Sequence, residues 1–173
     1  MGRSGLGIAP GHTLMGRAFI LLVPLFLMGI KAQAIDISAA GGWNQSVDQS
    51  NLVSGPGSEL IEVYESTTSG TVIDVSNCTG DSDNWRIDVR RIDDGGWHGD
   101  FVLYLKRTSD GDGNGLVWGG LAYVEVTETD TELFSGAGNR SDIDLQYKLT
   151  GMSTAVSPDD YSQTIIFTLV DVP

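Results

Sequence analysis

The alternation that decides the fold lies in Ile143-Asp144-Leu145-Gln146-Tyr147-Lys148-Leu149-Thr150. Every second residue of this stretch is apolar, and the residues between them are polar or charged. Successive side chains of a β-strand point to opposite faces of its sheet. The stretch therefore predicts a strand with one buried face and one face in water.

Similar segments occur elsewhere in the chain. Trp85–Arg90 and Phe101–Leu105 repeat the alternation, and Ser162–Asp171 adds Ile166 and Val170 on its second face. That second apolar set predicts partial cover on both sides of the last strand. Weaker strand candidates are 35–39, 59–64, 71–76 and 117–127, the last with a bulge or bend at Gly119-Gly120.

No window from residue 35 onward keeps apolar residues at helical spacing. Turn clusters rich in Gly, Asp and Ser separate the strand candidates at roughly 8–15 residues, which is typical of sandwiches and barrels. Parallel strands are usually connected by crossover helices, and the sequence predicts about eight strands and no helices. The strands are therefore expected to pair antiparallel. We predict an all-β fold, an antiparallel two-sheet sandwich of the immunoglobulin-like or pilin-like kind.

The residues before position 35 have the pattern of a secretory signal peptide. Arg17 precedes an apolar run over 18–30, and Ala32-Gln33-Ala34 follows as a cleavage site. The run is shorter than the roughly 20 residues needed to span a bilayer. We predict cleavage of residues 1–34, with the start at Met1 or Met15; a retained N-terminal anchor is the alternative.

The mature chain is then a single domain, 35–173, exported to the periplasm, the cell surface or the medium. Its first part, 35–57, is expected to be either a flexible arm or a first strand. Arg3, Arg17 and Lys31 leave with the leader, so 7 basic and 23 acidic residues remain, a net charge of −16. This charge disfavours binding to nucleic acid and, after cleavage, to membranes. Expected partners are other protein chains (copies of itself or surface proteins) or envelope polysaccharide.

Few residues of the mature chain offer nucleophilic or metal chemistry. Cys78 is the only cysteine, so we expect a buried, inert thiol or a bond to another chain. His98 is the only histidine after the leader, too few for a histidine zinc site, and no Gly-x-Ser-x-Gly elbow is present. We therefore expect a protein that is not an enzyme, with a secreted enzyme of unrecognised type as an alternative.

The run Asp110-Gly111-Asp112-Gly113-Asn114-Gly115 resembles the front half of a calcium loop. Asp110, Asp112 and Asn114 stand at relative positions 1, 3 and 5, with glycine at 6. Relative position 12 is Leu121, where a helical calcium loop has glutamate. The run predicts either a calcium site that takes further ligands from elsewhere or a hairpin turn between the flanking strands.

Two of the four tryptophans are candidates for stacking on sugar rings. Trp97 lies in a glycine-rich turn, and Trp43 follows Gly41-Gly42. Trp85 is in phase with the buried residues of its strand and is expected in the core. Trp97 and Trp43 are therefore the candidate ligand-binding residues, with turns that an aromatic side chain pins in place as the alternative.

The tail Pro158–Leu169, a Pro turn and a Tyr leading into an alternating last strand, resembles the end of bacterial surface sandwiches. The spore coat U and fimbrial-subunit families end in this way, as do the WxL cell-wall-binding proteins. The first two families usually carry a disulfide pair, and this chain has only Cys78. In place of a Trp-x-Leu motif it has Trp85-Arg86-Ile87. The resemblance implies an extracytoplasmic bacterial sandwich.

These observations together predict an exported, non-enzymatic surface or structural protein that acts through contacts with proteins or envelope polymers. An assembling, fimbrial-like or coat-like subunit is one form of this. A carbohydrate-binding sandwich module is the alternative.

Overall fold

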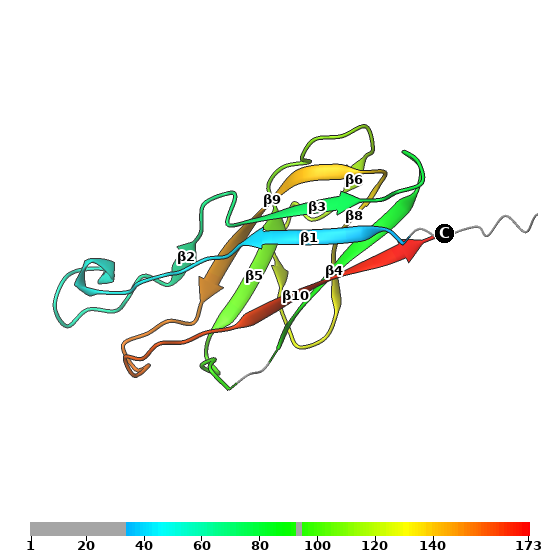
Figure 1. Ribbon diagram of the computed structural model, residues 1–173. Helices are drawn as coiled ribbons and strands as arrows, with labels where there is room; N and C mark the ends of the chain where they lie inside the picture. Colours follow the sequence, from blue (N-terminus) through cyan, green and yellow to red (C-terminus); the bar gives the residue numbers. More distant parts are fainter. Residues whose placement is uncertain (1–33, 93–94) are drawn as a thin grey trace, which may run out of the picture. The chain divides into compact units, whose positions relative to one another are not determined.

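The computed structural model describes residues 34–92 and 95–173. Two antiparallel β-sheets pack face to face around a shared core, so the predicted two-sheet sandwich is confirmed (Figure 1). Within the described residues, no helix is long and apolar enough to cross a membrane. The predicted signal peptide lies outside the described residues, apart from Ala34.

The larger sheet has six strands in the order β1-β3-β9-β5-β7, with β2 paired to the end of β9. Its strands are β1 (Asp36–Gly41), β2 (Val63–Glu65), β3 (Thr71–Ser76), β5 (Val102–Arg107), β7 (Val124–Glu125) and β9 (Arg140–Thr150). The decisive alternating segment forms most of β9. Three strands, β2, β3 and β5, pair with β9, and β1 and β7 extend the sheet from β3 and β5.

The smaller sheet has four strands in the order β10-β4-β8-β6. They are β4 (Asn84–Ile92), β6 (Val117–Trp118), β8 (Thr131–Ala137) and β10 (Thr164–Val172). One 3-10 helix, η1 (Gln49–Asn51), lies in the long connection between β1 and β2. Its first backbone N–H groups are capped by the side chain of Asp48.

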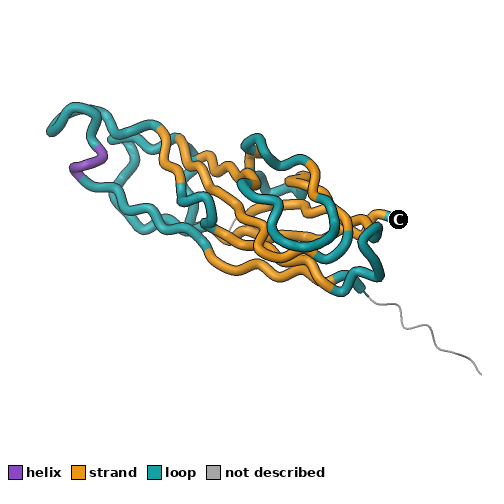
Figure 2. The backbone as a smooth tube through the Cα atoms, turned by 90° about the horizontal axis from the view of Figure 1, so that it is seen from above, coloured by secondary structure: helices purple, strands orange, loops and turns teal. Residues whose placement is uncertain are grey.

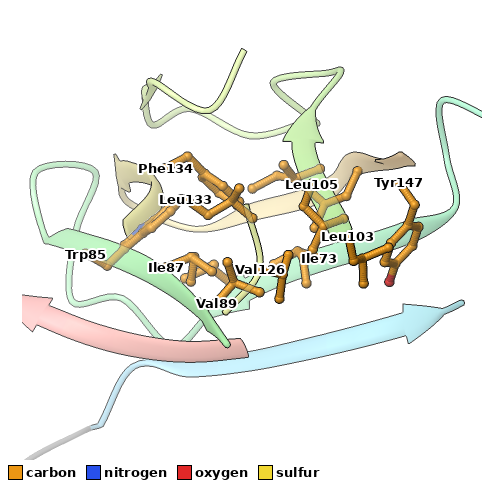
Figure 3. Close-up of a cluster of buried hydrophobic side chains, with 13 residues drawn as sticks. Ile73, Trp85, Ile87, Val89, Leu103, Leu105, Val126, Leu133, Phe134 and Tyr147 are labelled. Atoms are coloured by element: carbon orange, nitrogen blue, oxygen red, sulfur yellow. The ribbon is translucent and has the colours of Figure 1, made fainter. Parts of the chain in front are cut away.

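The core consists of the inward side chains of both sheets, which point toward one another (Figure 3). Trp85 meets Phe134 edge to face at 6.1 Å, and its indole N–H donates to the carbonyl of Gly138. Gly136 leaves room for this indole: a Cβ there would lie 2.4 Å from Cη2 of Trp85. The tryptophan expected in the core is thus confirmed there, with 1 % of its surface exposed.

The weaker strand predictions had mixed outcomes. All of segment 35–39 except Ile35 belongs to β1, which pairs with β3 of the same chain, so this part of 35–57 is a first strand and not a free arm. Segment 71–76 is β3 as predicted. Segment 59–64 is wrong except at its end, since β2 begins only at Val63. Segment 117–127 contains two strands of two residues each, β6 and β7, which belong to different sheets.

Cys78 follows β3 and is a free, half-buried cysteine. Its backbone N–H donates to the side chain of Asn139, which ties the end of β3 to the turn between β8 and β9. Burial raises the pKa of the Cys78 thiol, and nearby Asp83 and Asp171 raise it further. A raised pKa keeps the thiol protonated at neutral pH and lowers its reactivity.

Candidate functional site

A cleft of about 1350 Å³ opens between the two sheets at one end of the sandwich. Two long connections line it: the one from β1 to β2, which contains η1, and the one from β9 to β10. Figure 1 shows both connections on the same side of the strands, and Figure 2 shows the loops around the short helix at that end. The rim of the cleft is therefore made of loops, and rigid strands form its floor.

The floor combines side chains from both sheets. Leu103, Tyr147 and Leu149 come from β5 and β9, whereas Ile165 and Phe167 come from β10. Leu103, Tyr147 and Leu149 are buried, and Ile165 and Phe167 are half-buried and pack against the same core. The floor of the cleft is therefore the apolar end of the core.

Trp43 lies in the cleft on top of the floor. Its ring stacks on Tyr147 with centroids 6.2 Å apart and planes at 19°. The hydroxyl of Tyr147 is fixed in turn by a 2.6 Å hydrogen bond with Thr71. Burial raises the pKa of Tyr147, although the bond to Thr71 acts in the opposite direction. This stack holds the Trp43 indole in place, and no described residue accepts a hydrogen bond from its N–H.

A glycine positions Trp43 at the end of β1. Gly41 has φ +107°, a conformation that side chains disfavour, and a Cβ there would lie 2.7 Å from the carbonyl oxygen of Gly70. The backbone of Gly42 then donates to that same carbonyl. Only glycine at position 41 lets the chain leave the strand at this angle and direct Trp43 into the cleft.

Trp97 reaches the same cleft from the connection between β4 and β5. Its indole N–H donates to the carbonyl of Phe101 at 3.1 Å, and its ring meets the Phe101 ring edge to face at 5.5 Å. Tyr161 packs on the other side of Phe101, at 5.0 Å. The two predicted tryptophans therefore line one cleft, although they lie in separate loops.

The polar part of the cleft is neutral or acidic. Asp48, Asp159 and Asp160 line it together with several amide and hydroxyl side chains, those of Asn44, Gln45, Ser46, Gln49, Ser153, Thr154, Ser157, Ser162 and Gln163. No lysine or arginine is among the described lining residues. Such a cleft repels anionic ligands and offers hydrogen bonds to neutral ones.

Trp97 and Trp43 are both half-buried, and another tryptophan is more exposed. Trp118 on β6 has 47 % of its surface in solvent, near the exposed Leu116 and Leu121. It lies in the smaller sheet and does not line the cleft. No sequence pattern indicates this exposure, because Trp118 stands beside apolar Val117 in a short strand.

The predicted calcium loop, 110–115, is organised around an arginine. Arg140 at the start of β9 has 8 % of its surface exposed, and its guanidinium fills the inner side of the loop. It donates to the backbone carbonyls of Asp110, Gly111, Gly113 and Gly115. These five hydrogen bonds use all five N–H donors of the side chain.

A second buried arginine holds the other end of this connection. Arg107 forms an ion pair with Asp110 and donates to the carbonyls of Ser109 and Gly119. The loop also crosses from β5 in one sheet to β6 in the other, so the hairpin expected between these strands is wrong. Backbone carbonyls that would face a cation thus already face the Arg140 guanidinium.

Calcium binding through Asp110, Asp112 and Asn114 stays a prediction that the geometry disfavours. Within the described residues, no group of three or more Asp, Glu, His or Cys is placed to hold a metal ion. The loop carbonyls of Gly111 and Gly113 already accept hydrogen bonds from the cationic Arg140, which makes them poorer ligands for a calcium ion.

We expect the melting temperature to be the same in millimolar calcium and in chelator. A ligand that binds only the folded state would raise it by mass action. Differential scanning calorimetry in the two buffers measures this directly. A higher melting temperature in calcium, abolished by Asp112→Ala but not by Asp130→Ala, would establish the calcium site instead.

His98 packs between aromatic rings. Its ring lies 5.2 Å from Phe101 and 5.7 Å from Tyr161, and its Nδ1 accepts from the backbone N–H of Asp100. No described serine or threonine is hydrogen-bonded to the ring. In this arrangement His98 supports the Phe101–Tyr161 cluster below the cleft.

Comparison of the chain with protein-family models, curated proteins and solved structures finds no match.

Proposed function

We propose that this chain is an exported, non-enzymatic binding protein whose cleft takes a segment of a neutral polysaccharide. The observation that carries the proposal is the meeting of Trp43 and Trp97 in one cleft. Sugar rings present apolar C–H faces and polar edges, which suits a site with aromatic surface and convergent neutral polar groups. The leader pattern in 1–34 supports export.

The negative charge of the domain restricts the class of polysaccharide that the cleft can bind. The mature chain carries a net charge of −16, and the cleft itself contains Asp48, Asp159 and Asp160. Anionic polymers such as uronic-acid or sulfated glycans would bring like charges together. Neutral hexose polymers avoid this cost and can still stack on the indole of Trp43.

We expect Trp43→Ala to weaken binding to a neutral polysaccharide at least about tenfold, because the stacked indole is its central apolar contact. Isothermal titration calorimetry against neutral and anionic polysaccharides of equal length measures the affinity. Trp118→Ala removes an exposed tryptophan outside the cleft and serves as the matched control.

Circular dichroism melting of both variants checks that each remains folded. Three results would refute the proposal: equal loss of affinity in both variants, tighter binding of the anionic polymer, or no binding of any neutral polysaccharide in the series.

A further inference from the structure

The outer edge of β10 has unused backbone hydrogen-bonding groups. β10 pairs with β4 along its whole length, from Thr164 opposite Ile92 to Val172 opposite Asn84. On its other side, no described residue forms a backbone hydrogen bond with the strand. β1 of the other sheet lies nearby but pairs only with β3 (Figure 1). Such an edge is a template for a further strand.

β10 lacks the features by which proteins usually protect an edge. Between Thr164 and Val172 it contains no proline, lysine or arginine, and its pairing with β4 shows no register shift. Its single charge is Asp171. The edge strands on the opposite side of the sandwich, β6 and β7, have only two residues each. A long, apolar and regular edge strand such as β10 readily pairs with a strand of another chain.

The sequence of β10 is complementary to itself. In an antiparallel pair centred on Thr168, Phe167 faces Leu169 and Ile166 faces Val170 of the second copy. Phe167 and Leu169 are on the core side and Ile166 and Val170 on the outer side, so apolar residues pair on both faces near the axis, while farther out Ile165 faces Asp171. The two Asp171 side chains lie about 20 Å apart along the strand direction, beyond the screening length of about 8 Å in physiological salt.

We propose that two copies of this chain associate through β10, joining their smaller sheets into one continuous eight-stranded sheet about a two-fold axis at Thr168. Under a two-fold axis, the free edge of each β10 is paired with the β10 of the other copy. Neither edge remains open, so the assembly stops at a dimer. This inference rests on the edge of β10 and is independent of the ligand proposed for the cleft. Because residues 35–173 of each copy hold 7 basic and 23 acidic residues, a net charge of −16, the dimer should strengthen as salt concentration rises.

Disulfide trapping tests the register directly. Directly opposite residues of antiparallel strands have Cα atoms about 4.5–5.5 Å apart, within the range of a disulfide. In a Cys78→Ser background, Thr168→Cys should form a covalent dimer under mild oxidation. Thr164→Cys, which faces Val172 of the other copy, should not. Equal cross-linking at both positions, or none at Thr168, would overturn the proposed pairing.

Sedimentation velocity tests the association without cysteines. We expect the dissociation constant of the dimer to fall with added sodium chloride. It should rise at least about tenfold in Ile166→Lys, which places a charged, edge-protecting lysine opposite the apolar Val170 of the other copy. Trp118→Lys, on the opposite edge of the same sheet, is the matched control and should leave it unchanged. A wild-type chain that stays monomeric at high concentration in high salt would refute the inference. If Ile166→Lys fails to fold, the Thr168→Cys result decides.

Discussion

Replacing Arg140 by methionine is expected to lower the free energy of unfolding by about 3 kcal/mol, the upper end of the usual cost of an unsatisfied buried acceptor. The substitution keeps the length of the apolar stem but removes the guanidinium. Four backbone carbonyls of the 110–115 loop then lose their donor. The bond to Gly115 is buried and those to Asp110, Gly111 and Gly113 are partly buried, so water replaces the missing donors only in part. Asp110 keeps its ion pair with Arg107, so the loss comes mainly from the unpaired carbonyls.

Urea denaturation of the variant and of two controls measures this effect. Arg140→Lys retains the charge but has three N–H donors, whereas arginine uses five. Its free energy of unfolding should therefore lie between those of the wild type and Arg140→Met. Arg90→Met removes an exposed ion pair with Asp130 at 3.4 Å and should cost at most about 1 kcal/mol. Equal losses for Arg140→Met and Arg90→Met would show that Arg140 does not organise the loop.

Leu145→Ala is expected to destabilise the fold by about 2–5 kcal/mol, the usual cost of a cavity in a well-packed core. Leu145 is completely buried on β9, between Thr71 of β3 and Arg107 of β5. Lys148 on the opposite face lies over the rings of Tyr104 and Tyr123, so Lys148→Ala should cost at most about 1 kcal/mol. If urea denaturation gives equal losses of unfolding free energy for Leu145→Ala and Lys148→Ala, the assignment of Leu145 to the buried face of β9 is wrong.

The strands that the sequence predicts well are those whose alternation is unbroken. β9, β4 and β10 keep a period of two, and the inward residues of each pack in the core. β8 was not predicted because its pattern is interrupted. Its register with β4 shifts after Ile87, which faces Phe134, while Asp88 faces Glu132. The residue in between, Leu133, is therefore extra in the ladder, and adjacent Leu133 and Phe134 are both buried.

The candidate site could be predicted residue by residue but not as a whole. Glycine-rich surroundings pointed to Trp43 and Trp97 individually, yet only the pairing of strands distant in sequence brings them to one cleft. Arg140 gave no signal, since a charged residue next to a turn normally indicates an exposed position. Its burial depends on a loop 25–30 residues earlier in the chain that supplies carbonyls from four residues. No local pattern encodes a contact of that kind.

The most direct test of the proposed binding site is the ¹H–¹⁵N spectrum of the four tryptophan indoles during titration with a neutral polysaccharide. Each indole N–H gives its own signal, and the structure assigns the four to different surroundings. We predict that the signals of Trp43 and Trp97 shift progressively with added polysaccharide. The signals of Trp85, buried and bonded to Gly138, and of Trp118, exposed elsewhere, should stay in place. A spectrum in which Trp43 does not move, or in which only Trp118 moves, would contradict the assignment of the cleft as the binding site.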